Sequence, residues 1–242
     1  MLIAIPSKGR PYKSKSMDFL GGGAIMFAPQ CEVKDYEKIY PGKIIGVPDD
    51  VRGITPTRNW ILKQHLGEDV VFVDDDLKVC KYLKYYGNCV LKHTKLTGEQ
   101  VKAEFEKLFE LTKSLGWKIW GVNTESSKIS TRINKPFIFR SYITASCMGI
   151  VNDGTLFFDE SYKVKEDYEI GLRHVVKYGG VLKARYFYWE NEHWTTDGGC
   201  KEYRTNAVED ECIRKLIKQY PGMVRRVSRK NSAYCIKLMF DD

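Results

Sequence analysis

The feature that most constrains the fold is a short apolar run, Val70–Val73, that leads directly into three adjacent aspartates, Asp74, Asp75 and Asp76. Four consecutive apolar residues predict a strand buried on both faces, which is typical of the parallel sheet of an α/β protein. Ligands of such sheets bind beyond the carboxyl ends of the strands. Three neighbouring carboxylates repel one another, so we expect a cation at this point, Mg²⁺ or Mn²⁺ held together with substrate phosphates. The alternative is a solvated acidic turn.

Strands and helices alternate on both sides of this run. Further strands are predicted at Leu2–Pro6, Ala24–Ala28, Lys43–Val47, Trp117–Val122, Tyr142–Val151 and Val181–Trp189. Helical spacing of apolar residues and helix start and stop signals predict helices at Thr55–Leu66, Thr97–Leu115 and Glu166–Tyr178. The alternation indicates an α/β fold with a parallel sheet in a layer between helices.

The charge distribution sets the end of the chain apart. From Arg214 to Lys237 there are basic residues and no acidic ones. We therefore expect residues 1–205 to form the α/β domain and residues 206–242 to form a basic extension packed on it. The formal net charge of +8 favours a polyanionic partner, which is nucleic acid, an acidic membrane surface or a phosphate-rich substrate. The alternatives are an unselective basic surface and, for the extension, a solvated helix and loop.

The cysteines and the N-terminus bear on the compartment. The seven cysteines are scattered, odd in number and form no CxxC pair, which argues against a disulfide framework and favours a reducing compartment. The first residues, Met1–Pro6, have no basic region ahead of an apolar stretch, so we expect no signal peptide. No apolar run approaches the roughly 20 residues that span a bilayer. We expect a soluble cytoplasmic protein with no membrane partner.

Two segments carry groups suited to binding a nucleotide. The loop Ile5–Pro11 follows the first strand, where its backbone amides can surround a nucleotide and Lys8 or Arg10 can neutralise phosphate. Thr55–Asn59 begins a helix one strand before the aspartates, and its Arg58 can reach a diphosphate. The alternative for Arg58 is a surface charge in the first turn of the helix.

Two later segments carry acids and a histidine. Lys165 and the pair Glu166 and Asp167 open a helix, where a carboxylate usually caps the helix. One acid would take that role and the other would act as a general base towards an acceptor hydroxyl. His193 follows an aromatic strand and is a candidate third metal ligand or phosphate contact, although a lone histidine is more often structural.

Taken in this order, these residues resemble a GT-A glycosyltransferase over residues 2–200. The resemblance rests on the first loop, on an arginine-bearing helix, on a DxD motif that ends a strand, on an acidic pair and on a late histidine. The matching residues are Pro6, Ser7, Arg10, Arg58, Asp74, Asp76, Glu166, Asp167 and His193. Within that fold, the loop Ile5–Pro11 and the Thr57-Arg58-Asn59 helix resemble the TET-associated glycosyltransferases, phage enzymes related to those that make glucosylated thymine (base J) in kinetoplastids.

The resemblance implies a GT-A α/β fold with a mixed, mainly parallel sheet. It implies a UDP-sugar as donor, most commonly UDP-glucose. It implies as acceptor a 5-hydroxymethylpyrimidine in DNA, such as 5-hydroxymethylcytosine. It implies host cytoplasm as the location if the chain is phage-encoded. The residues that would bind the nucleotide sugar are Pro6, Ser7, Lys8, Arg10, Arg58, Asp74 and Asp75. The ligands of Mn²⁺ or Mg²⁺ would be Asp74, Asp76 and His193. The catalytic pair of an inverting transfer would be Asp167, as base, and Glu166. The DNA contacts would come from Arg225, Arg226, Arg229 and Lys230.

Three alternatives remain open at this point. A GT-A glycosyltransferase can act on a glycan, lipid or protein instead of DNA. A non-catalytic nucleic-acid-binding protein can retain a GT-A shell. A nucleotidyltransferase also pairs carboxylates around Mg²⁺, but it releases pyrophosphate instead of a nucleoside diphosphate.

Overall fold

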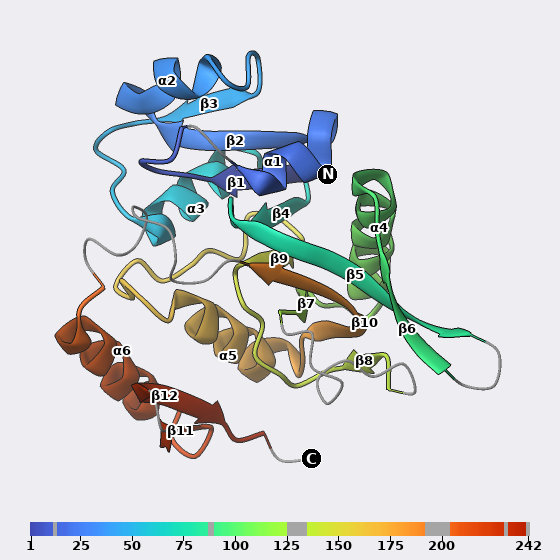
Figure 1. Cartoon of the computed structure of the whole chain (residues 1–242). Helices are drawn as coiled ribbons and strands as arrows, with labels where there is room; N and C mark the ends of the chain where they lie inside the picture. Colours follow the sequence, from blue (N-terminus) through green and yellow to red (C-terminus); the bar gives the residue numbers. More distant parts are fainter. Residues whose placement is uncertain (12–13, 87–89, 125–134, 192–203, 230–231, 241–242) are drawn as a thin grey trace.

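The computed structural model of the chain describes residues 1–11, 14–86, 90–124, 135–191, 204–229 and 232–240. In these residues ten strands form one sheet (Figure 1). They are β1 (Leu2–Pro6), β2 (Ala24–Pro29), β3 (Ile44–Val47), β4 (Val70–Val73), β5 (Leu77–Tyr86), β6 (Val90–Lys95), β7 (Ile119–Asn123), β8 (Phe137–Ile138), β9 (Cys147–Ile150) and β10 (Leu182–Asn191).

Helices flank this sheet, and a small hairpin follows it. The α-helices are α1 (Lys15–Leu20), α2 (Val33–Glu37), α3 (Ile54–Gln64), α4 (Gly98–Ser114), α5 (Glu166–Tyr178) and α6 (Asn206–Gln219). Two short 3₁₀ turns, η1 (Gly21–Gly23) and η2 (Gln30–Glu32), flank β2. The hairpin consists of β11 (Val224–Arg229) and β12 (Ser232–Leu238).

The strand directions confirm the predicted mixed, mainly parallel sheet. The strand order is β3-β2-β1-β4-β9-β7-β10-β5-β6, with β8 paired to β10. Strands β1 to β4 are parallel to one another, and β7 is parallel to β10. Between these two groups β9 is antiparallel to both of its neighbours. The predicted strand at Tyr142–Val151 is therefore shorter than expected and reversed, because an apolar run does not reveal the direction in which a strand pairs.

The core lies on both faces of the sheet, as the alternation of side chains along β4 shows. Val71 and Val73 pack into one apolar cluster, which α1 and α4 cover. Val70 and Phe72 pack into a second cluster, which α3 and α5 cover. All four side chains are fully buried, so the strand that precedes the aspartates is fixed from both sides.

The long helices begin and end close to their predicted bounds, because their terminal residues carry local signals. Thr97 and Gln100 form a capping box at the start of α4. Gly116, just after α4, and Gly179, just after α5, have positive φ angles of 70° and 86°, which glycine adopts without steric cost. Each of these two helices therefore lies within one residue of its prediction.

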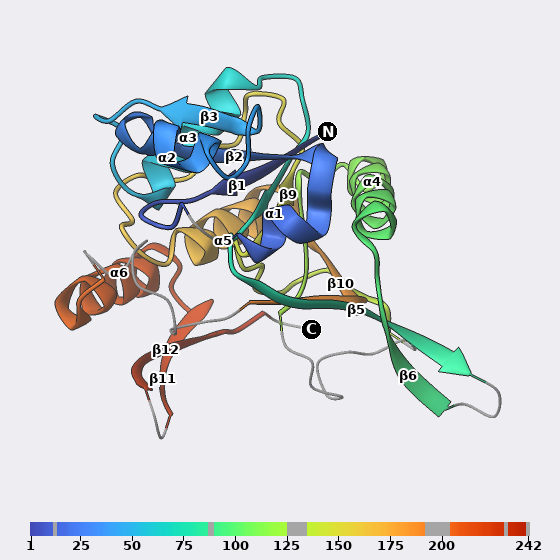
Figure 2. The ribbon, with the colours of Figure 1, turned by 45° about the horizontal axis from the view of Figure 1, so that its top comes forward.

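Two parts of the fold were not predicted. Strands β5 and β6 form a long hairpin at one edge of the sheet, and the outer parts of the two strands extend away from the body (Figures 1 and 2). The chain after residue 205, for which the sequence predicted a packed basic extension without named elements, forms α6 and the β11–β12 hairpin. Ile213 and Leu216 of α6 share an apolar cluster with Leu172 of α5, so this C-terminal unit packs against the sheet-covering helix.

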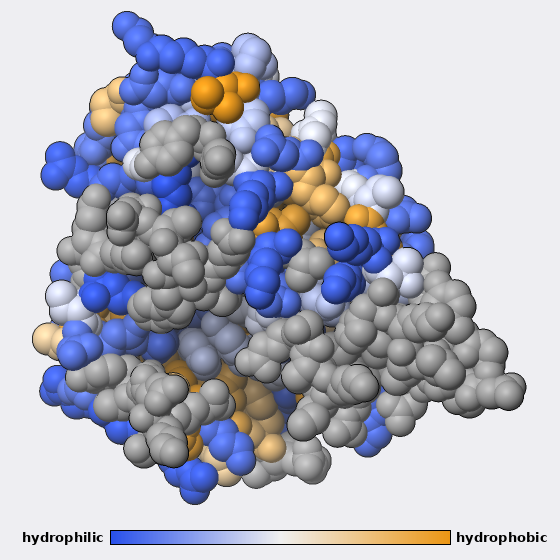
Figure 3. All heavy atoms as spheres, in the orientation of Figure 1, coloured by the Kyte–Doolittle hydropathy of each residue, from blue (hydrophilic) through white to orange (hydrophobic). Residues whose placement is uncertain are grey.

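Figure 3 shows one face of the molecule, on which the described residues are mostly hydrophilic with smaller apolar areas between them. None of the helices in the described ranges is long and apolar enough to cross a bilayer.

His174 of α5 is a buried titratable group of the fold. Its ring is 0% exposed, with Nδ1 lying 2.7 Å from the Gly180 carbonyl oxygen and Nε2 accepting the Lys118 backbone N–H at 3.0 Å. The neutral ring with its proton on Nδ1 fits both partners. Burial lowers the pKa of His174 to about 4, from a usual 6.5.

Replacing this histidine tests its contribution to stability. The unfolded chain binds a proton near pH 6.5 and the folded chain only near pH 4, so stability is lost as the pH falls through this window. We expect the stability advantage of the unaltered chain over His174→Gln to shrink by about 2–3 kcal/mol between pH 7 and pH 4.5. Urea unfolding at several pH values measures this, and parallel pH profiles for the two chains would contradict it.

Candidate functional site

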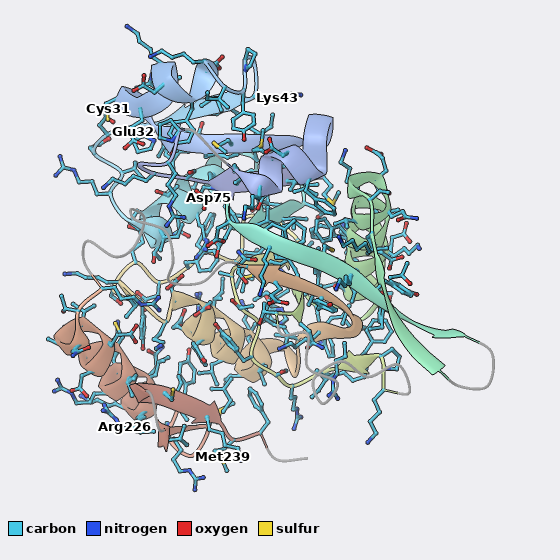
Figure 4. All side chains as sticks on the ribbon, in the orientation of Figure 1. Cys31, Glu32, Lys43, Asp75, Arg226 and Met239 are labelled. Atoms are coloured by element: carbon cyan, nitrogen blue, oxygen red, sulfur yellow. The ribbon has the colours of Figure 1, made fainter. Side chains whose placement is uncertain are left out.

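A cavity of about 1090 Å³ opens where β1 and β4 end. Its walls come from the loop after β1, from the start of α3, from Asp74–Asp76, from residues 142–146 and from residues 160–168. These segments are far apart in the sequence and meet because the strands that precede several of them are neighbours in the sheet. Figure 4 shows Asp75 near the centre of the molecule, with Cys31 and Glu32 to one side and Arg226 far away on the C-terminal hairpin.

The loop after β1 is bound to the middle aspartate. Ser7 Oγ donates to Asp75 Oδ2 at 2.5 Å, and Arg10 Nη1 donates to Asp75 Oδ1 at 2.8 Å. Tyr36 supports this contact, because its hydroxyl lies 2.9 Å from Ser7 Oγ and accepts the Arg10 backbone N–H at 3.0 Å. Asp75 is 5% exposed. Both of its oxygens therefore hold the first loop in place at the cavity.

The start of α1 fixes the backbone of the acidic run. Ser16 Oγ donates to the Asp74 carbonyl at 2.5 Å, and Ser14 Oγ, which also caps α1, donates to the Asp75 carbonyl at 3.1 Å. On the other side, Asn191 Nδ2 donates to Asp76 Oδ1 at 2.7 Å. These contacts fix the backbone of Asp74 and Asp75 and orient the carboxylate of Asp76. Nothing in the sequence identified Ser14, Ser16 or Asn191, because each comes from an element distant in the chain.

The carboxyl of Asp74 is strongly affected by its surroundings. Burial raises the pKa of its carboxyl to about 7, and the negative charges of Asp76, Asp75 and Glu166 act in the same direction, against the Arg58 guanidinium. Its side chain is still 38% exposed, towards the cavity that it lines. A second cation at this carboxylate would therefore relieve repulsion that Arg58 alone leaves uncompensated.

Arg58 of α3 is buried, and the alternative of a surface charge is wrong. Its side chain is 4% exposed and its guanidinium lies over the rings of Phe72 and Phe158, at 5.9 and 5.6 Å from the centroids. Nη1 donates to Glu166 Oε1 at 2.7 Å, and Nη2 lies 3.7 Å from Asp74 Oδ1. Arg58 lines the cavity and links the end of β4 to the start of α5.

The acidic pair at the start of α5 has two different environments. Glu166 is 8% exposed, and burial together with the charge of Asp167 raises its pKa, while the ion pair with Arg58 opposes the shift. Asp167 lines the cavity and accepts a hydrogen bond from the Tyr142 hydroxyl. Its Oδ1 also accepts the Tyr168 backbone N–H at 2.9 Å. Glu166 is thus committed to Arg58, whereas Asp167 is held by hydrogen bonds at the cavity wall.

An aromatic pair lies beside Asp167. The rings of Tyr142 and Tyr168 are stacked, with centroids 3.9 Å apart and planes inclined by 14°. Burial raises the pKa of Tyr142 well above its usual value, and the charge of Asp167 adds to the shift. Tyr142 therefore stays protonated and can donate to Asp167 at neutral pH. No pattern in the sequence pointed to a role for this tyrosine.

The other predicted site residues are divided between described and undescribed parts of the chain. Pro6 and Lys8 line the cavity. His193 and Lys230 lie outside the described residues. Arg225, Arg226 and Arg229 belong to β11, where Arg226 forms an ion pair with Asp210 of α6.

The donor set at the cavity fits a divalent ion that substrate phosphates help to bind. In the described ranges no group of three or more His, Cys, Asp or Glu residues forms a metal cluster. Asp75 uses both oxygens on Ser7 and Arg10. Asp74 and Asp76 remain as the carboxylates suited to the ion, and Mg²⁺ commonly binds through one or two carboxylates plus phosphate oxygens.

Solved structures with a similar fold include glycosyl-transferring enzymes. Glucosyl-3-phosphoglycerate synthase from Mycobacterium tuberculosis, in complex with phosphoglyceric acid, has a TM-score of 0.54 and 12% identity over 90% of this chain and 78% of that chain. Its complex with Mn²⁺, UDP-glucose and phosphoglyceric acid has a TM-score of 0.50 and 12% identity over 98% and 85%. TarS from S. aureus, in complex with UDP-GlcNAc, has a TM-score of 0.49 and 13% identity over 90% and 67%.

The likeness to the Mycobacterium tuberculosis synthase shows the fold, which is the GT-A fold expected from the sequence. No curated protein matches the chain in sequence. The profile of one sequence family, TET-Associated Glycosyltransferase, matches residues 1–199. That match covers most of the chain and includes the first loop, the aspartates, Arg58 and the acidic pair of α5. The chain therefore belongs to the TET-associated glycosyltransferase family.

Proposed function

We propose that this glycosyltransferase moves a sugar from a UDP-sugar, UDP-glucose in the first instance, to the hydroxyl of a 5-hydroxymethylpyrimidine in DNA. One observation carries the proposal. The carboxylates of Asp74 and Asp76 and the carboxylate of Asp167 line one cavity, which has a volume of about 1090 Å³. Cavities of this size enclose ligands as large as a nucleotide sugar.

The donor would bind along the first loop and the aspartates. Pro6, Ser7, Lys8 and Arg10 supply small residues and positive charge on this wall, and Asp75 fixes the loop. Asp74 and Asp76 would hold Mn²⁺ or Mg²⁺, with His193 as a further ligand. The ion, when bound, would neutralise charge on the departing diphosphate. Mn²⁺ and UDP-glucose are bound in the Mycobacterium tuberculosis synthase of similar fold, which supports this donor and cofactor.

The transfer would proceed with Asp167 as general base. Asp167 accepts the proton of the acceptor hydroxyl while that oxygen forms a bond to the anomeric carbon of the sugar. The bond from this carbon to the diphosphate oxygen breaks, and its electron pair leaves with the nucleoside diphosphate. Attack from the face opposite the leaving group inverts the anomeric configuration. Tyr142 orients the carboxylate of Asp167 through its hydroxyl group.

Glu166 would help to position Asp167 through its ion pair with Arg58. Their ion pair is buried, so it holds the first turn of α5 against α3 and keeps Asp167 at the cavity. Arg58 lies close enough to Asp74 to act on the diphosphate side of the cavity as well. Glu166 is therefore a positioning residue in this proposal.

The DNA acceptor is supported by the family and by the basic C-terminal unit. Arg225, Arg226, Arg229 and Lys230 would contact phosphates. Arg226 already pairs with Asp210, so its contact with DNA would require an exchange of partners. Association through such contacts weakens steeply as salt is added.

The acceptor assignment is tested with three duplexes of one sequence that carry cytosine, 5-hydroxymethylcytosine or 5-hydroxymethyluracil. Radiolabelled UDP-glucose and Mn²⁺ are supplied to each. We expect label in a hydroxymethylated duplex and none in the plain one. Transfer to a glycan or protein, with none to any of the three duplexes, would refute the DNA acceptor.

Two neighbouring variants separate the roles of the acidic pair. Asp167→Asn should lower kcat by about 10²–10⁴, the scale of a lost general base, without changing stability. Glu166→Gln should lower the free energy of unfolding by about 3 kcal/mol, the lower end for a broken buried ion pair, because Asp74 stays beside Arg58. Steady-state rates and urea unfolding measure the two effects. Near-normal turnover by Asp167→Asn would remove it from the role of base.

The metal assignment predicts a linked loss of activity and of donor binding. Chelation with EDTA, or the variant Asp76→Asn, should abolish the gain in UDP affinity that Mn²⁺ produces and lower turnover at least about 100-fold. Titration calorimetry with and without Mn²⁺ measures the gain. Asp35→Asn is the matched control, because Asp35 is an exposed acid of α2 outside the cavity. Unchanged Mn²⁺ dependence in Asp76→Asn would exclude Asp76 as a ligand.

A further inference from the structure

The hairpin of β5 and β6 has an unusual charge for an exposed edge of a sheet. From Leu77 to Lys95 the sequence contains five lysines, one histidine and no acidic residue. Exposed lysines at helices can have an acidic partner three residues away, as in the ion pairs of Lys107 with Glu104 and of Lys38 with Asp35. Lys78 pairs with Glu190 of the neighbouring strand β10. The sequence of the hairpin itself supplies no acidic partner for its lysines.

The strand register brings the lysines together. Lys81 pairs with Lys95, and Lys84 pairs with Lys92, in the antiparallel ladder of β5 and β6. Like charges directly opposite each other in a ladder are destabilising. Lysines on an edge strand also prevent edge-to-edge aggregation. That purpose requires charge only on β6, because β6 is the edge strand and β5 lies inside it. The paired lysines on β5 therefore call for another explanation.

The outer half of the hairpin stands without further support from the sheet. Strand β10 pairs with β5 only from Leu77 to Tyr82, and beyond that point β5 pairs with β6 alone in the described residues. Figures 1 and 2 both show the outer part extending away from the body. A two-stranded ribbon by itself is marginally stable. A polyanion bound along it would offset both its isolation and the repulsion between its lysines.

We infer that the β5–β6 hairpin binds duplex DNA, with the ribbon in the major groove and its lysines on the flanking phosphates. The major groove of B-DNA admits a two-stranded ribbon, and a 5-substituent of a pyrimidine lies in that groove. The ribbon begins at the residue after Asp76, so a duplex held along it leads to the cavity. This inference deepens the proposed function, on which the choice of DNA as partner rests.

The test compares two variants that lose the same charge. In the ribbon variant Lys81, Lys84, Lys92 and Lys95 become Thr, which suits strands. In the control variant four exposed lysines from other parts of the surface, Lys34, Lys38, Lys63 and Lys177, become Ala. Fluorescence anisotropy follows the binding of an unmodified duplex across a range of salt concentrations.

The ribbon variant should bind at least about tenfold more weakly at low salt, and the slope of log K against log salt should become shallower by about 1 for each lysine that contacts a phosphate. The control should bind like the unaltered chain. Equal weakening of both variants would overturn the inference, because it would show an effect of net charge alone. Thermal unfolding verifies that each variant is folded. If the fourfold ribbon variant does not fold, the double variant Lys84→Thr with Lys92→Thr takes its place.

Two further outcomes separate this inference from the proposed function. If the ribbon variant glycosylates hydroxymethylated duplex as fast as the unaltered chain, the hairpin is not the DNA-binding element. The assignment of DNA as acceptor would still hold. If duplex binding depends on the hairpin lysines but no sugar is transferred to any duplex, the hairpin binds DNA and the assignment of DNA as acceptor is wrong. An RNA duplex of the same sequence should bind more weakly, because its major groove is too narrow for side chains to enter. Equal, lysine-dependent binding of the RNA duplex would overturn insertion into the groove.

Discussion

The geometry of the site depends on one buried cation, Arg58. Its guanidinium lies over the rings of Phe72 and Phe158 and pairs with Glu166 at 2.7 Å. Desolvating an arginine costs several kcal/mol unless the partner is well placed, and losing one partner of a buried pair costs about 3–5 kcal/mol. The end of β4 and the start of α5 are therefore constrained to meet at Arg58. Any movement of α5 relative to the aspartates would separate these charges in a dry environment.

This constraint divides the acids of the cavity into two kinds. Asp75 and Glu166 are saturated by the chain's own hydrogen bonds and cations, and they fix the first loop and the first turn of α5. Burial raises the pKa of Asp74 and the neighbouring carboxylates add to the shift, so this carboxylate would be stabilised by an added cation. Adjacent acids therefore have different roles, one structural and the other in binding a cation. The groups that each acid contacts, rather than its position in the sequence, determine its role.

The sequence predicted those features that local chemistry determines. The strand before the aspartates, the capped helix α4 and the start of α5 follow from apolar patterns and terminal residues, and the structure confirms them. Partners that come from distant parts of the chain had no such signal. Tyr142 beside Asp167, Asn191 beside Asp76 and the buried setting of Arg58 arise only when strands and helices pack together. The antiparallel direction of β9 and the β5–β6 hairpin were missed because both depend on how distant strands pair.

The C-terminal unit lies beyond the residues that the family profile matches, and yet it contacts the site. Lys165, which precedes the acidic pair, has a φ of 65°, the one positive value outside glycine among the described residues. That conformation costs a non-glycine residue roughly 1–2 kcal/mol. Glu209 of α6 lies 2.9 Å from Lys165 Nζ and 2.7 Å from Arg204 Nε. Burial alone would raise the pKa of Glu209, but these two cations hold it below its usual value. The ion pair therefore offsets the strain of the turn that presents Asp167, and it makes α6 part of the structure that shapes the cavity.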